Sequence, residues 1–113
     1  MTYSKEILSG STNGLPIKVV ATATVGTTIH TAPAGTTGID NVTIYAHNIH
    51  TADVLLSIEL GEATMPIKIV VPMLTGLTLV LPDLPINNGK VITAFAATAN
   101  VICLTGTVNR ITA

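Results

Sequence analysis

Apolar and polar residues alternate with a period of two along most of this chain, which is the pattern of half-buried β-strands. In the segment 52–60, for example, Val54, Leu56 and Ile58 share one face. Ser57 and Glu59 share the other face and are expected to point outward. Runs of this kind, rich in β-branched residues, predict strands over 16–24, 26–32, 40–46, 52–60, 65–71, 76–81, 90–97 and 100–111.

The breaks between these runs are rich in turn-forming residues. Asn88-Gly89 predicts a β-hairpin, because both central positions of its tight turn need positive φ. The run 47–50 is expected to connect two strands as a second hairpin. Proline cannot donate to a strand ladder, so four prolines are expected at strand edges or in loops: Pro66, Pro72, Pro82 and Pro85.

About eight short strands in a chain of 113 residues predict an all-β fold, an antiparallel β-sandwich of two sheets. A jelly roll is the first choice of topology. An immunoglobulin-like topology is the alternative, weakened by the absence of Trp and of a second Cys. Residues 15–113 are expected to form the sandwich domain. Residues 1–14, which end in a run of Ser, Gly, Thr and Asn, are expected to form an N-terminal arm or a short first strand.

Charge is scarce in this composition. Lys and Arg total 5 and Asp and Glu total 6, so 10% of residues are charged, whereas an average domain has about 25%. Five basic residues cannot form the cationic footprint that binding to nucleic-acid phosphates needs. A surface so poor in charge, and supplied instead with 19 threonines, favours association. We therefore expect other subunits to cover much of it, with the chain itself forming a dimer or trimer.

No membrane segment is expected. The longest uncharged apolar stretch, 69–82, contains Pro72 and Gly76 and is shorter than the roughly 20 residues that a spanning helix needs. The first ten residues lack the apolar core of a secretory signal, so synthesis in the cytoplasm is expected.

Three residues are candidates for a metal site, namely His47, His50 and Asp53, which follow one another at intervals of three. That spacing suits a helix better than a hairpin tip. The competing interpretation is a polar turn with two exposed imidazoles, and no metal or other cofactor is assigned.

Catalysis has little support in the sequence. His30 and Asp40, with one of the many hydroxyls, supply the residue types of a hydrolytic triad, but no nucleophile lies in a recognisable motif. Cys103 lies in an apolar strand and is expected to be a small buried hydrophobe rather than a reactive thiol. We assign no catalytic residue and do not expect an enzyme.

Three stretches carry a resemblance to a known group of proteins. They are LSGSTNG at 8–14, GTTIHTA at 26–32 and AFAATANVICLTGTVNRI at 94–111. With them the chain resembles small structural proteins encoded in tailed-bacteriophage head gene clusters, the capsid decoration or cement proteins. The resemblance implies a β-sandwich or jelly roll that forms homo-oligomers on the virion surface and bridges neighbouring subunits of the major capsid protein. It brings no catalytic residues.

A second interpretation is a receptor- or carbohydrate-binding β-sandwich module of a phage tail or cell surface. It predicts a concave pocket in which Tyr45 or Phe95 is exposed beside a carboxylate. The scarcity of aromatic residues, 3% of the chain, weakens it.

Overall fold

The computed structural model describes residues 2–112, which form strands and connecting turns. Nine strands lie in this range: β1 (Thr2–Glu6), β2 (Ile17–Lys18), β3 (Thr27–Thr31), β4 (Ile39–Asn48), β5 (Val54–Leu60), β6 (Ile67–Val71), β7 (Thr78–Ile86), β8 (Val91–Ala96) and β9 (Ile102–Thr112). Among these residues there is no helix with the length and apolarity needed to cross a membrane.

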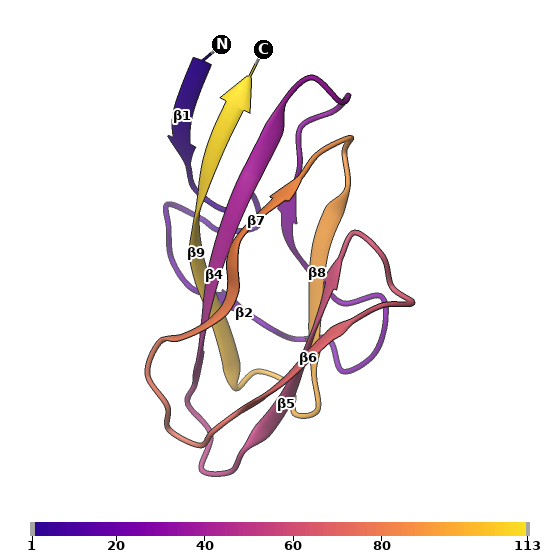
Figure 1. Ribbon diagram of the computed structural model, residues 1–113. Coiled ribbons are helices and arrows are strands. Elements are labelled where there is room, and N and C mark those ends of the chain that lie inside the picture. The colour runs from indigo at the N-terminus through magenta and orange to yellow at the C-terminus, as the bar shows by residue number, and fades with distance from the viewer. Residues whose placement is uncertain (1, 113) are drawn as a thin grey trace.

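The strands form two antiparallel sheets that face each other (Figure 1). Sheet A has the order β1-β9-β4-β7, with β2 also paired to β9, and sheet B has the order β3-β8-β5-β6. The pairs nest around the β5–β6 hairpin: β4 pairs with β7, β3 with β8, and β1 and β2 with β9. A long antiparallel ribbon folded over in this way is a jelly roll, so the predicted fold class is confirmed.

The core lies between the sheets and is filled by one face of each alternating strand. Ile44 on β4, Leu56 on β5 and Leu104 on β9 are completely buried there. The alternation therefore predicted the inward face correctly. Leu8, between β1 and β2, is only 1% exposed and belongs to the same core.

Both hairpin predictions are wrong, although the turn chemistry is right. Asn88 and Gly89 have φ of 58° and 69°, as the tight turn requires. This turn, however, joins β7 of sheet A to β8 of sheet B, and the run 47–50 likewise leads from β4 of sheet A to β5 of sheet B. Turn residues set how the chain reverses locally, and the jelly-roll wrapping sets which strand becomes the partner.

Strand limits differ from expectation by more than two residues in two strands. The strand predicted over 16–24 shrinks to β2, because the following residues leave sheet A and cross to β3 of sheet B. Strand β7 runs beyond its predicted end and includes Pro82 and Pro85. Within residues 2–112, β7 is an edge strand of sheet A, where prolines are tolerated, in agreement with the prediction that they lie at strand edges or in loops.

Candidate functional site

Six large apolar side chains are exposed together at one end of the sandwich, and we call this group the apolar patch. Its members are Tyr45, Ile49, Met73, Leu74, Leu77 and Leu79, and each is between 37% and 66% exposed. In Figure 1 the two connections that carry much of it, after β4 and after β6, lie at the end of the molecule opposite the termini.

The patch is continuous across several elements. Tyr45 on β4 is paired with Leu79 on β7. Ile49, Leu74 and Leu77 line one open hollow of about 400 Å³, together with His47, Asn48, Thr75 and Gly76. The two stretches that supply the patch, 41–52 and 69–82, contain no Lys, Arg, Asp or Glu. An apolar surface without charge among its residues is typical of a protein–protein contact.

Leu74 has an unusual backbone conformation within the patch. Its φ is 53°, in the left-handed region that disfavours residues with a Cβ. The turn is held by the Leu74 amide, which donates to the carbonyl of His50 at 3.1 Å, while the side chain stays 66% exposed. A strained residue that presents a leucine to solvent adds nothing to the core, and such strain is often retained for function.

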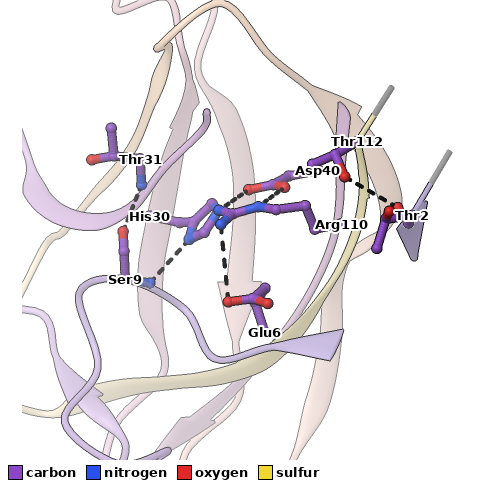
Figure 2. Close-up of polar contacts among 8 residues, drawn as sticks. All are labelled: Thr2, Glu6, Ser9, His30, Thr31, Asp40, Arg110 and Thr112. Atoms are coloured by element: carbon purple, nitrogen blue, oxygen red, sulfur yellow. Dashed lines mark hydrogen bonds and ion pairs between the residues drawn. The ribbon is translucent and has the colours of Figure 1, made fainter. Parts of the chain in front are cut away.

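A second candidate is a buried ionic network that joins three strands (Figure 2). Asp40 on β4 is completely buried and accepts two hydrogen bonds from Arg110 on β9, from Nε at 2.8 Å and Nη2 at 3.0 Å. Its Oδ2 also lies 2.7 Å from Nε2 of His30 on β3, which is 1% exposed. The network therefore links both sheets.

The carboxylate of Asp40 is held in its charged form. Burial alone raises the pKa of Asp40, but the hydrogen bonds from Arg110 and His30 and the guanidinium charge outweigh it and bring the pKa below the ordinary value. In return, the hydrogen bonds to Asp40 raise the pKa of Arg110 despite its partial burial. Each ion compensates for the desolvation of the other.

His30 and Asp40 do come together, but not as part of a hydrolytic triad. The backbone amide of Ser9 donates to Nδ1 of His30 at 3.0 Å, so both ring nitrogens are occupied. The Ser9 hydroxyl accepts a hydrogen bond from the amide of Thr31 at 2.7 Å and points away from the imidazole (Figure 2). A general base needs a free nitrogen within reach of a nucleophile, and this buried ring has none.

Glu59 is the centre of a third polar cluster. It points outward from sheet B, as expected, yet it is only 2% exposed, because the segment before β3 covers it. The hydroxyls of Thr24 and Thr93 and the amide of Gly26 donate to its carboxylate. Burial raises the pKa of Glu59, and these three hydrogen bonds more than offset that effect and lower it.

The three candidate metal ligands are not brought together. His50 donates its amide to Asn48 Oδ1 at 2.8 Å, which closes a local turn. Asp53 accepts the amide of Met73 at 2.9 Å and so holds the neighbouring connection in place. Among residues 2–112, no group of three or more His, Cys, Asp or Glu side chains is close enough to hold a metal ion.

Cys103 is buried, with 9% of its surface exposed, but it lies outside the main core. It belongs to the outer face of sheet A, where its neighbours across the strands are Lys18 and His47. Nδ1 of His47 is buried and has no hydrogen-bond partner within residues 2–112. His47 also lines the hollow of the apolar patch.

The sequence analysis did not identify the roles of Arg110 and Glu59. For Arg110 the sequence does contain a signal. Asp40 is two residues before Val42 and four before Ile44, so the alternation places all three side chains on the inward face of the strand. A carboxylate buried there needs a cation as its partner. Nothing in the pattern points to the segment that covers Glu59.

Comparison of the chain with models of protein families, with curated protein sequences and with solved structures gives no match.

Proposed function

We propose that this chain is a structural protein that acts by associating with other protein subunits and that it performs no catalysis. The observation that carries the proposal is the apolar patch, a group of exposed apolar side chains supplied by two stretches without a charged residue. Isolated exposed apolar residues are normal on protein surfaces, but a continuous patch of this kind marks a contact site.

The assembly that we propose follows from the resemblance of the chain to phage decoration proteins. In that case the partner is the major capsid protein, and the chain sits on the outer capsid surface as cement. A protein that binds the assembled shell but not the free subunits stabilises the shell by mass action. Many copies on one particle make weak individual contacts sufficient.

The sandwich that carries the patch is tied together by buried hydrogen bonds located away from the patch itself. These are the bonds of the Asp40–Arg110 pair and the Glu59 cluster, which join distant segments. A contact surface held in one conformation loses less entropy on binding.

The carbohydrate-binding alternative requires Tyr45 or Phe95 beside a carboxylate in a pocket. The residues that line the hollow of the apolar patch include no carboxylate, and Nζ of Lys68 lies over the ring of Phe95, 5.9 Å from the ring centroid. Neither aromatic residue offers the arrangement expected for a carbohydrate site.

The test is to look for the chain in particles. Virions from a phage lysate that contains the gene are banded in a density gradient, and the chain is quantified by mass spectrometry against the major capsid protein. We expect a copy number similar to that of the lattice subunits. Recovery of the chain only from the particle-free fraction would overturn the proposal.

A matched pair of variants ties the result to the surface. Leu74→Lys places a charge in the apolar patch, whereas Val70→Lys places one on a residue of β6 outside it that is also more than half exposed. We expect Leu74→Lys to lower the occupancy on particles and Val70→Lys to leave it unchanged. Equal occupancy of the two variants would contradict a role for the patch.

A further inference from the structure

The free edges of the two sheets differ in how they are protected. An edge strand exposes unpaired backbone groups, and proteins usually guard it with charged residues, proline or a covering segment. On sheet A, β1 carries Lys5 and Glu6, and β2 carries Lys18. On sheet B, β6 carries Lys68 at its second position.

The edge at β3 is protected by a covering segment. The amide of Gly10 donates to the carbonyl of Ile29 at 2.9 Å. Ser9 contributes two more hydrogen bonds, one to His30 and one from the amide of Thr31. The segment around Ser9 and Gly10 therefore occupies the outer side of this strand.

The first half of β7 carries no charge, proline or covering segment within residues 2–112, although its pairing with β4 has a register shift between Leu79 and Leu81. Within residues 2–112, β7 pairs only with β4, so its other side is open. Pro82, Asp83 and Pro85 guard the second half. The first half, Thr78 to Leu81, and the two residues before it read Gly-Leu-Thr-Leu-Val-Leu, without charge or proline. Such a segment is a strong candidate for pairing with another strand.

We propose that a second copy of this chain pairs with the open half of β7, strand against strand across a two-fold axis, and that the apolar patches of the two copies pack together beside it. The proposal rests on the proposed assembly function and deepens it: the second copy covers the patch, and the dimer rather than the single chain is the unit that binds the shell. A two-fold contact brings the same surface of each copy together. None of the six patch residues is charged, and the carboxylate of Asp53 lies beside them, where it accepts the amide of Met73.

The exposed area of the patch sets an upper limit on the area that a dimer could bury through it. If a fully exposed large side chain presents about 200 Å², the exposed fractions of the six patch residues correspond to roughly 600 Å². Burying that area on both copies gives about 1,200 Å², which is the lower end of the range for specific interfaces. Backbone hydrogen bonds between the two β7 strands would add to the contact and fix its register.

The test measures the mass of the full-length chain by size-exclusion chromatography with light scattering. We expect a dimer at about 100 µM, a concentration that populates even a weak complex. Leu77→Lys and Leu79→Lys place on the open edge the residue that natural edges use for protection, so each should weaken the dimer at least tenfold. Val70→Lys, the same change at the edge strand β6, should leave the dimer intact.

Cysteine cross-linking tests the contact without adding charge. In a Cys103→Ala background, Leu79→Cys should form a disulfide-linked dimer under mild oxidation, and Val70→Cys should not. A wild-type chain that is monomeric at this concentration would overturn the proposal. So would a dimer that resists both lysine variants and cross-links equally through residue 70.

These outcomes are separate from those of the particle experiment. A chain that is present on particles but monomeric in solution retains the assembly function and loses the β7 contact. A chain that dimerises through β7 but never appears on particles retains the contact and loses the function.

Discussion

The guanidinium of Arg110 donates two hydrogen bonds to the buried carboxylate of Asp40, a residue 70 positions earlier in the chain. The pair lies across the β4–β9 ladder, where the two residues are direct register partners. Glu6 on β1 lies 3.9 Å from the same guanidinium, so the N-terminal strand also contacts it. The pair thus connects segments that are distant in sequence at the end of the sandwich where β1 and β9 meet.

Removing the cation should destabilise the fold. In Arg110→Met the carboxylate of Asp40 keeps its burial and loses two charge-assisted donors, which should cost about 2 kcal/mol because the guanidinium itself is partly exposed. Urea denaturation followed by circular dichroism measures the change. Lys90→Met removes a cation from an exposed residue and should change the unfolding free energy by less than about 0.5 kcal/mol. Equal stability of the two variants would show that the pair contributes nothing.

The imidazole of His30 should carry its proton on Nε2. A backbone amide can only donate, so Nδ1 must accept the hydrogen bond from Ser9, and Nε2 must then donate to Asp40. Long-range ¹H–¹⁵N correlation spectra at neutral pH distinguish the two tautomers directly. A proton on Nδ1 would contradict the hydrogen-bond arrangement.

Stability should fall in acid because of Asp40 and Glu59. Hydrogen bonds hold the pKa of each carboxyl below its ordinary value in the folded state. Their contribution is therefore complete above the unfolded pKa values, about 4, and is lost as pH falls through the lower folded values. The melting temperature should be nearly flat from about pH 8 to pH 6 and decrease below about pH 5.

Glu59→Gln provides the control for the acid response. The amide keeps an acceptor for Gly26 and Thr93 but cannot be protonated in this range. Its melting temperature should decline less steeply below about pH 5 than that of the wild type. An unchanged acid slope would mean that other groups control the response.

Gly106 should not tolerate a side chain. A Cβ at this position on β9 would clash with the backbone carbonyl oxygen of Thr43 on the neighbouring strand. Because backbone cannot move aside easily, Gly106→Ala should destabilise the protein by about 3 kcal/mol. Gly76→Ala is the matched control, since a Cβ there meets nothing within 4 Å. Thermal melts of both variants test the difference.

Leu8 should be needed for folding although it precedes the main run of strands. It is 1% exposed and packs in the core, so Leu8→Ala should cost about 3 kcal/mol. Its neighbour Ile7 is 51% exposed, and Ile7→Ala should be nearly neutral. Chemical denaturation of the two variants compares adjacent positions with the same kind of truncation. Similar stabilities would place Leu8 outside the cooperative unit.

The alternation of residues predicted most of the fold because each inward position reports local burial. Val42, Ile44 and Ala46 are buried as the pattern requires, and so are Leu56 and Ile58. Pairing partners were harder, because the Asn88-Gly89 turn fixes only its own backbone, and the jelly-roll wrapping places the next strand in the other sheet. Local sequence carries no information on that choice.

The candidate site was only partly predictable for a similar reason. The uncharged stretch 69–82 was visible in the sequence, but its exposure was not, since apolar residues usually become buried. Glu59 is buried although the pattern placed its side chain on the outward face. A segment more than thirty residues earlier in the chain covers it. Both results depend on contacts between distant parts of the chain.

The adjacent ends of β1 and β9 have a practical consequence. Thr2 and Thr112 are register partners, and Figure 1 shows both termini at one tip of a molecule that is 46 Å long, with the apolar patch toward the other tip. Any polypeptide joined at either end would project away from the contact surface. A domain fused at either terminus would therefore extend away from the apolar patch and leave the proposed contact unobstructed.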